Sequence, residues 1–392
     1  MVDHLKNKLA MLKQQGGLRK SRPLQIQSFH AQDQEKETSL INFSSNDYLG
    51  LSSDQDLLNE FFSEIDLSRQ SNWMSASSAR PLTGTSLHHE ALESAIAQDF
   101  GKEKALIFNS GYHANSGILP ALTTKQDLIL ADKLVHASII DGLRLAEADF
   151  KRFAHNDMVH LEQLLNRYAS QYERVWLVTE SVFSMAGDAA LLKELVALKK
   201  QFSAYLYVDE AHAIGCFGKK GLGLADHLDL VNEIDVVVGV FGKALASVGA
   251  FVAANQVIVD SLINFSRSWL FSTALPPINV QWNAFVWNKL ASFEKQRQQL
   301  QHLSTTFRLQ LQQAGIESLG ETYIVPILRA GNEAAIETSN YLERQGFLAM
   351  PIRSPTVRKG TERVRFSLTA NVPESSVIEV VNVLAEMKAG AN

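Results

Sequence analysis

The feature that most constrains the fold is a regular alternation of two kinds of segment between residues 88 and 268. Short apolar runs rich in β-branched residues predict buried strands, and stretches with apolar residues at helical spacing predict helices between them. Alternation at this spacing is typical of a mainly parallel sheet that is covered by helices on both faces. The predicted strands are 105–109, 128–131, 149–153, 175–180, 205–209, a run around Val236, and 250–254; the predicted helices are about 88–100, 136–147, 157–171, 190–202 and 256–268.

A second domain is predicted after Pro276-Pro277, where the alternation ends. Residues 278–313 predict one or two long helices, and a shorter mixture of strands and helices follows them to residue 388. The expected fold class is therefore α/β, with a smaller α+β C-terminal domain. We divide the chain into an N-terminal helix and arm (1–45), a large domain (46–280) and a small C-terminal domain (281–392).

Composition excludes several classes of protein. The chain has 392 residues and a net charge of −5 without a basic block, which argues against nucleic acid as the main partner. A single cysteine, Cys216, excludes an intramolecular disulfide and a multi-cysteine zinc site, and no metal site is predicted. No run approaches about 18 apolar residues, so we expect no transmembrane helix and a soluble cytoplasmic protein. Residues 3–14 predict an amphipathic helix that packs on the main body or on a second subunit.

Two charged residues come directly after predicted buried strands. Asp209 ends an apolar strand, and an ionised carboxylate buried there needs a cationic partner such as a protonated heterocyclic nitrogen. Lys243 follows the next strand, where the cost of burying its charge favours a neutral amine that can act as a nucleophile or form an imine. Taken alone, Lys243 is better explained as a lysine that ends a strand and reaches water along its stem.

Further candidates lie at the carboxyl ends of neighbouring strands, where sheets of this kind bind ligands. His136 follows one strand, His212 lies three residues after Asp209, and Ser110-Gly111-Tyr112 opens a helix whose backbone amides can hold a phosphate. Each feature is weak alone. The combination favours pyridoxal 5′-phosphate (PLP) as the cofactor, because successive strand ends carry an acid, a lysine, a histidine and a helix N-terminus that can bind phosphate.

The sequence resembles the α-oxoamine synthase branch of the fold-type-I PLP-dependent transferases over nearly its whole length. The resemblance implies a homodimer with shared active sites that condenses an amino acid with an acyl thioester, of coenzyme A or a carrier protein, and releases carbon dioxide. It is carried by segments that begin near the predicted N-terminal arm and continue into the C-terminal domain. These segments are 42–51, 110–112, 136–138, 152–157, 179–188, 208–212, 241–243, 271–277, 353–357 and 360–369.

The resemblance also implies roles for the residues at the strand ends. Lys243 is similar to the lysine that holds the cofactor, and Asp209 to the acid that keeps the pyridine nitrogen protonated. His136 resembles the histidine that stacks on the cofactor ring, and His212 the one that bonds the ring hydroxyl. We therefore expect Lys243, His136 and Asp209 to carry the catalysis.

Four further cofactor contacts are implied. Gly111 and Tyr112 match positions of the phosphate cradle, with Tyr112 also at the ring. Ser184 matches a serine that contacts the cofactor. Ser272 resembles a residue that reaches the phosphate from a neighbouring subunit.

The resemblance places substrate contacts in other segments. Arg365 resembles the arginine that holds the amino-acid carboxylate, a task suited to a bidentate guanidinium. Arg19 and Thr356 match positions that contact the acyl or coenzyme A substrate, and Asn46 lies in a loop that lines the site. His136 is also placed to orient the acyl carbonyl.

One residue departs from the family pattern. The family has a threonine three residues before the lysine, where its hydroxyl donates to the phosphate, and here that position is Val240. We expect backbone amides or Ser272 to replace the hydroxyl, with weaker cofactor binding. Three alternatives to the implied activity are a condensation of glycine with acetyl-coenzyme A, a plain aminotransferase and an inactive scaffold subunit, and the presence of Lys243 argues against the scaffold.

Overall fold

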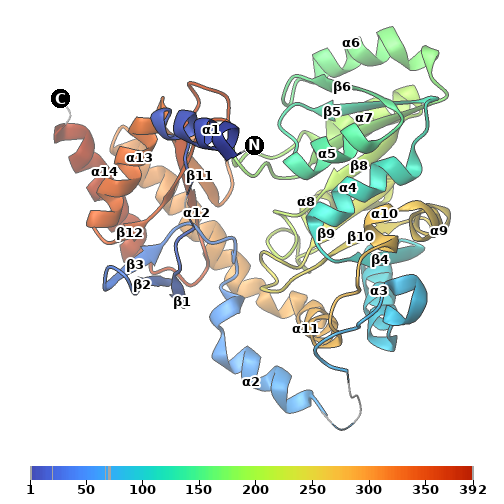
Figure 1. Ribbon diagram of the computed structural model, residues 1–392, viewed down its shortest axis with the longest axis horizontal. Helices are drawn as coiled ribbons and strands as arrows, with labels where there is room; N and C mark the ends of the chain where they lie inside the picture. The colour runs from blue at the N-terminus through green and yellow to red at the C-terminus, as the bar shows by residue number, and fades with distance from the viewer. Residues whose placement is uncertain (1, 20, 67, 69–71, 391–392) are drawn as a thin grey trace. The chain divides into compact units, whose positions relative to one another are not determined.

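The computed structural model describes residues 2–19, 21–66, 68 and 72–390. Their contacts divide the chain into two compact units (Figure 1). The central unit contains residues 54–183 and 189–295, and the terminal unit contains residues 1–53, 184–188 and 296–392. The N-terminal residues thus group with the C-terminal ones, while the division into three domains at residues 46 and 281 stays a prediction.

The central unit is built on a seven-stranded sheet with the order β4-β10-β9-β8-β7-β5-β6. Strands β9, β8, β7, β5 and β6 pair in parallel, and β10 is antiparallel to both of its neighbours. The predicted α/β fold with a mainly parallel sheet is therefore confirmed. The strands are β4 (Lys104–Phe108), β5 (Asp127–Asp132), β6 (Asp149–Phe153), β7 (Arg174–Glu180), β8 (Tyr205–Asp209), β9 (Val236–Val240) and β10 (Ala250–Ala254).

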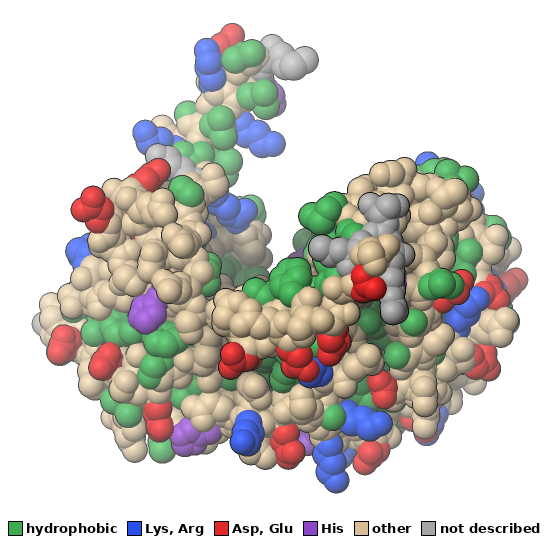
Figure 2. Space-filling view, turned by 90° about the horizontal axis from the view of Figure 1, so that it is seen from below, with side chains coloured by type: hydrophobic (Ala, Val, Ile, Leu, Met, Phe, Trp, Pro, Cys, Tyr) green, Lys and Arg blue, Asp and Glu red, His purple; other side chains and the backbone are tan. Residues whose placement is uncertain are grey.

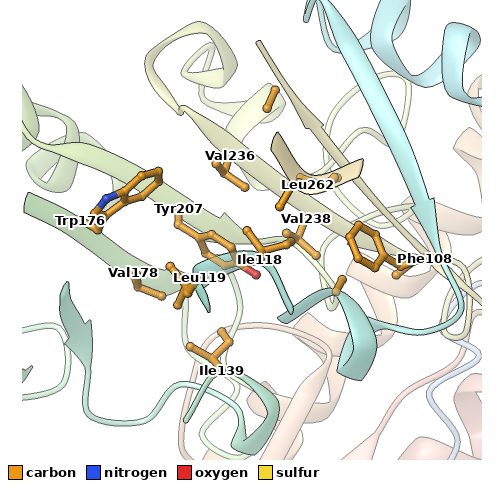
Figure 3. Packing of buried hydrophobic residues seen from close by; sticks show 14 of the residues in the cluster. Phe108, Ile118, Leu119, Ile139, Trp176, Val178, Tyr207, Val236, Val238 and Leu262 are labelled. Atoms are coloured by element: carbon orange, nitrogen blue, oxygen red, sulfur yellow. The ribbon is translucent and has the colours of Figure 1, made fainter. Parts of the chain in front are cut away.

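Helices cover both faces of this sheet. On one face, α4 packs against α5, α9 and α10 over a core of buried apolar side chains (Figure 3). Alternate residues of the strands, such as Val236 and Val238 of β9, point into this core, as the period of two of a strand requires. On the other face, Phe251 packs against Phe100 and Trp287. The helices are α2 (Gln55–Glu64), α3 (Leu87–Asp99), α4 (Gly111–Leu122), α5 (Ala137–Leu145), α6 (Met158–Tyr168), α7 (Leu192–Phe202), α8 (Leu224–His227), α9 (Gln256–Phe265), α10 (Arg267–Leu270) and α11 (Pro277–Asn288).

Side-chain caps begin the helices that matter for the site. The Ser110 hydroxyl accepts a hydrogen bond from the His113 amide and so caps α4 directly after β4. His136 caps α5 in the same way after β5, through its ring nitrogen and the Ser138 amide. A polar residue at such a position pairs amides that the helix itself leaves unpaired. Both helices therefore begin at the carboxyl ends of strands.

Among the described residues, the terminal unit contains two small sheets and four α-helices. One sheet has the order β1-β2-β3-β12 and the other β11-β14-β13. Phe43 lies at the centre of its core and contacts Phe307, Phe347 and Phe366. The elements are α1 (Val2–Gln14), β1 (Gln25–Gln27), β2 (His30–Asp33), β3 (Thr38–Asn42), α12 (Glu294–Gln313), β11 (Ile324–Leu328), α13 (Asn332–Arg344), β12 (Phe347–Leu348), β13 (Met350–Ile352), β14 (Arg363–Ser367) and α14 (Glu374–Gly390).

Three features differ from the sequence expectations. The hairpin of β1 and β2 was not predicted, since its apolar residues are few, and the helix α2 was missed although its leucines and phenylalanines lie at helical spacing. Helix α1 forms as predicted, but none of its residues is buried.

Among the described residues, we find no helix with the length and apolar character needed to span a bilayer. On the face shown in Figure 2, acidic and basic side chains are interspersed and neither kind forms a continuous patch.

Candidate active site

A cavity of about 350 Å³ opens in the central unit where β7, β8 and β9 end and α4 begins. The location agrees with the rule that such sheets bind ligands at the carboxyl ends of their strands. Most of the predicted cofactor residues of this unit meet here. The predicted residues that line the cavity are Gly111, Tyr112, His136, Asp209, His212 and Lys243.

Asp209 lies at the inner end of the cavity and is 4% exposed. Its Oδ2 accepts a hydrogen bond of 2.7 Å from Asn115 Nδ2, and its Oδ1 accepts one of 2.8 Å from the Ala211 amide. Donors on both oxygens stabilise the ionised carboxylate. Asp209 thus presents a buried carboxyl group that can pair with a cation in the cavity.

Glu180 is a second buried carboxyl group in the cavity wall. Burial is the main cause that raises its pKa well above the usual value, and the neighbouring Asp209 raises the pKa further. Lys243 acts in the opposite direction. Within the described part of the chain, Glu180 Oε1 has no hydrogen-bond partner. Burial therefore favours the neutral form of Glu180.

His136 lines the cavity and is held by Ser138. Its Nδ1 lies 2.7 Å from Ser138 Oγ and accepts the Ser138 amide at 3.3 Å. Burial lowers the pKa of the imidazole, and the nearby Lys243 lowers it as well, while Asp209 raises it. The ring is therefore neutral near pH 7.

Lys243 follows β9 in a tight loop and is half-buried in the cavity wall. Gly111 lies near it at the start of α4, where a Cβ atom would come within 2.8 Å of Val240 Cγ1. Only glycine fits there, which lets a ligand approach the helix N-terminus closely. A buried carboxylate, a lysine and an open helix start in one cavity fit the ring, aldehyde and phosphate of PLP.

Tyr112 is fixed at the cavity rim although its side chain is 51% exposed. Its hydroxyl donates to Asp141 on α5, and this hydrogen bond raises the pKa of the phenol. The phenol therefore stays protonated, and its aromatic ring is held in place beside the cavity.

Three of the remaining predicted residues meet in the terminal unit. Arg365 on β14 is 9% exposed, and its Nε donates to the carbonyl of Ser184 at 2.7 Å. Its Nη2 donates to Asn46 Oδ1 at 3.2 Å and lies 3.4 Å from the Tyr48 hydroxyl. Ser184 therefore contributes its backbone carbonyl to this cluster, whereas a contact of its hydroxyl with a cofactor stays a prediction.

Arg19 and Thr356 also lie together in the terminal unit. An Nη2 hydrogen of Arg19 is donated to Thr356 Oγ1, and both residues are exposed. Arg353 supports the same region because its Nη1 donates to the carbonyls of Gly16 and Leu18. These hydrogen bonds therefore hold the chain segments around residues 17 and 355 next to each other.

Ser272 does not line the cavity of its own chain. Its hydroxyl donates to the Ser268 carbonyl at 2.7 Å, at the end of α10. A role for Ser272 in the site of a neighbouring subunit stays a prediction.

Four polar residues in the cavity wall were not predicted as site residues: Asn115, Ser138, Glu180 and Ser247. Asn115 lies one helical turn after Gly111, and Glu180 ends a predicted strand next to Asp209. The sequence pattern could therefore have indicated both as site residues. Ser138 follows His136 by two residues. No sequence pattern predicts the loop conformation that places Ser247 in the cavity wall.

Comparisons with known proteins show which family the chain is similar to. Residues 38–384 match the family described as aminotransferase class I and II. The chain is 52% identical to 8-amino-7-oxononanoate synthase of Haemophilus ducreyi over 344 residues, which cover 86% of this chain and 89% of that protein.

Two solved structures resemble the fold. One is a serine palmitoyltransferase from S. paucimobilis with bound PLP and myriocin, with a TM-score of 0.89, 28% identity, and coverage of 100% of this chain and 98% of that one. The other is 8-amino-7-oxononanoate synthase from Francisella tularensis, with a TM-score of 0.75, 28% identity, and coverage of 90% and 99%.

Proposed function

Since the chain belongs to the aminotransferase class I and II family, and within it to the 8-amino-7-oxononanoate synthases, we propose that it condenses L-alanine with a pimeloyl thioester in biotin biosynthesis. It is a PLP-dependent acyltransferase. The proposed products are 8-amino-7-oxononanoate, carbon dioxide and free coenzyme A, or the free carrier protein if that carries the pimeloyl group. The observation that carries the proposal is the meeting of Lys243, Asp209 and His136 in one cavity beside an open helix start.

Residues of the central unit would hold the cofactor, and among them His212 would bond its ring hydroxyl. Lys243 would bind PLP covalently through its Nζ, and the amides at Gly111 and Tyr112 would bind its phosphate. Asp209 would pair with the protonated pyridine nitrogen, because both of its oxygens are already set as acceptors. When bound, PLP supplies an electron sink for a carbanion at the amino-acid Cα.

The protein's own groups then move protons and hold the substrates. The amine of Lys243 would accept the α-proton of L-alanine. The Cα attacks the thioester carbonyl, so that a carbon–carbon bond forms and the carbon–sulfur bond breaks, with coenzyme A leaving as its thiol. Loss of the carboxylate as carbon dioxide and return of a proton to Cα complete the reaction.

Two groups in the terminal unit would bind substrate. Arg365 would hold the alanine carboxylate, since its guanidinium is buried and oriented by Ser184 and Asn46. Arg19 and Thr356 would contact the acyl thioester.

The proposal includes a homodimer that works in the cytoplasm. Ser272 would complete the phosphate site of the neighbouring subunit, as the sequence resemblance implies. A gel-filtration or light-scattering mass of the holoenzyme at twice the 43.4 kDa of one chain would support the dimer.

The test is thiol release by the purified holoenzyme with two substrate pairs. Release with pimeloyl-CoA and L-alanine, and not with acetyl-CoA and glycine, supports the proposal. Release only with acetyl-CoA and glycine assigns the chain as a 2-amino-3-ketobutyrate ligase instead. Conversion of PLP to its amine form without any need for a thioester assigns a plain aminotransferase.

The variant Lys243→Ala is the matched control. It is expected to abolish thiol release while the protein still folds and binds PLP without a covalent bond. Turnover retained by Lys243→Ala contradicts the proposed role of the lysine. A wild-type protein that binds PLP but releases no thiol with any acyl donor is an inactive scaffold subunit.

A further inference from the structure

A buried hydrogen-bond network joins the two groups that face the cofactor ring in the proposed function. At its centre lies Asn115 of α4, which is 2% exposed. Its Nδ2 lies 2.7 Å from Asp209 Oδ2 and 3.0 Å from Ser138 Oγ, so both of its hydrogens have acceptors. Its Oδ1 accepts the hydroxyl of the buried Tyr207, whose side chain is visible in Figure 3. Ser138 Oγ in turn contacts His136 Nδ1.

The direction of each hydrogen bond in the network follows from Asp209. An ionised carboxylate only accepts, so Asn115 must turn its amide nitrogen toward Asp209 and its oxygen toward Tyr207. Ser138 Oγ then accepts from the second hydrogen of Nδ2, and its own hydrogen is free to be donated. The acceptor within reach is His136 Nδ1, which also accepts the Ser138 amide.

Two donors at Nδ1 determine the tautomer of His136. A nitrogen that accepts hydrogen bonds carries a lone pair and no hydrogen, so the neutral ring has its proton on Nε2. Nε2 lies on the opposite side of the ring from Ser138, and no described residue pairs with it.

We propose that Asn115 is a positioning residue that couples Asp209 to His136 through Ser138. The charge of Asp209 orients Asn115, and Asn115 and Ser138 fix His136 as a donor through Nε2–H. This inference rests on the proposed function in taking the cavity as the PLP site. It adds that His136 offers a hydrogen to an oxygen atom in the cavity and does not accept a proton at Nε2.

The coupling assigns the proton chemistry to separate residues. A neutral imidazole with Nε2 protonated can donate to the thioester carbonyl oxygen, where negative charge develops as the carbon–carbon bond forms. The same ring cannot remove the α-proton, which leaves that step to Lys243.

The first experiment measures the tautomer of His136 directly. Holoenzyme with ¹⁵N-labelled histidine is studied by two-bond proton–nitrogen NMR at pH 8, with the His136 signals assigned from a His136→Asn variant. The expected wild-type signal has Nδ1 unprotonated and Nε2 protonated. A wild-type ring with its proton on Nδ1 overturns the proposal.

Variants test the coupling. Ser138→Ala and Asn115→Ala are both expected to shift His136 toward a mixture of the two tautomers. Asn115→Ala should also weaken PLP binding about 10- to 100-fold, since it removes a hydrogen bond to a charged group, whereas Ser138→Ala should leave PLP affinity within about threefold. An unchanged tautomer in both variants contradicts the coupling.

Thr123→Val is the control for the loss of a buried hydrogen bond in the same region. The Thr123 hydroxyl donates to the Leu119 carbonyl at the end of α4, away from the cavity wall. This variant should change neither the tautomer nor PLP binding. If Asn115→Ala does not fold, Ser138→Ala still tests the tautomer. A wild-type protein with the expected tautomer that fails the thiol-release test contradicts the proposed function and leaves the network intact.

Discussion

Glu180 and Asp209 lie opposite each other in register at the ends of the parallel strands β7 and β8. Both carboxyl groups are buried in the wall of the same cavity, and they differ in their partners. Asp209 accepts hydrogen bonds from Asn115 and the Ala211 amide, whereas one oxygen of Glu180 has no partner in the described structure. Two like charges on neighbouring strand ends are unfavourable, which adds to burial in raising the pKa of Glu180 above its usual value.

The first prediction concerns the pH dependence of stability that Glu180 causes. Its folded pKa is raised above 4.5, so its contribution to stability is present below pH 4.5 and is lost as the pH rises toward the folded pKa. We expect the unfolding free energy of the wild type to fall, relative to Glu180→Gln, as the pH rises above 4.5, by up to about 1.4 kcal/mol per pH unit. Urea denaturation of cofactor-free protein measures it, because a bound pyridinium would act on the same carboxyls.

Glu210 gives an internal comparison for this measurement. It is buried outside the cavity wall, accepts the amides of Leu224 and Ala225, and has a pKa raised by burial to about 7. The difference between wild type and Glu210→Gln should therefore level off above about pH 7. Parallel pH profiles for wild type and Glu180→Gln would show that Glu180 is ionised in the folded protein, against the prediction.

The sequence predicted the sheet because its strands are nearly continuous apolar runs, such as Val236–Val240, that are buried on both faces. It also predicted that Asp209, His136 and Lys243 would meet, since strand ends of a parallel sheet lie at one edge. It did not predict Ser247 or Ser138 as wall residues. Their positions depend on the conformation of a loop and of a helix cap, and the spacing of apolar residues predicts neither.

The second prediction concerns Val240, where a phosphate donor is missing. The Ser247 hydroxyl lines the same cavity as Val240, is buried, and has no hydrogen-bond partner among the described residues. We expect Ser247 to supply the donor, so Ser247→Ala should weaken PLP binding about 3- to 10-fold. Val240→Thr should strengthen it by a similar factor, since the change keeps the side-chain shape and adds a hydroxyl.

Equilibrium titration of the apoprotein with PLP, followed by absorbance, measures both variants. Ser261→Ala serves as the control, because the Ser261 hydroxyl donates to the Val257 carbonyl on the exposed side of α9. Equal affinities for wild type and Val240→Thr would mean that the lost threonine costs nothing. An unchanged affinity in Ser247→Ala would exclude Ser247 as the donor.

The third prediction concerns the amino-acid carboxylate. Arg365→Lys loses the fork of the guanidinium and the Nε bond to Ser184, and a lysine cannot replace both. We expect the KM for L-alanine to rise about 10- to 100-fold with a smaller change in the KM for the acyl thioester. Steady-state kinetics with each substrate varied in turn measures the two constants.

Arg363→Lys is the matched control, because Arg363 lies two residues away on the same strand. Its guanidinium donates to the carbonyls of Thr361 and Met185, so the variant tests the loss of a buried arginine from β14 in general. A similar rise in the KM for L-alanine in both variants would show that strand stability, and not carboxylate binding, causes the effect.

The fourth prediction concerns the contact between Arg19 and Thr356. Both side chains are exposed, so their hydrogen bond contributes no more than about 1 kcal/mol to stability, and Arg19→Ala and Thr356→Val should unfold within about 2 °C of the wild type. If the pair contacts the acyl thioester, each variant should raise the KM for the thioester while the KM for L-alanine stays constant. The double variant separates a joint site from two independent contacts. An increase smaller than the product of the single effects indicates that Arg19 and Thr356 hold the thioester as one unit, and a KM unchanged in all three variants removes both residues from the substrate site.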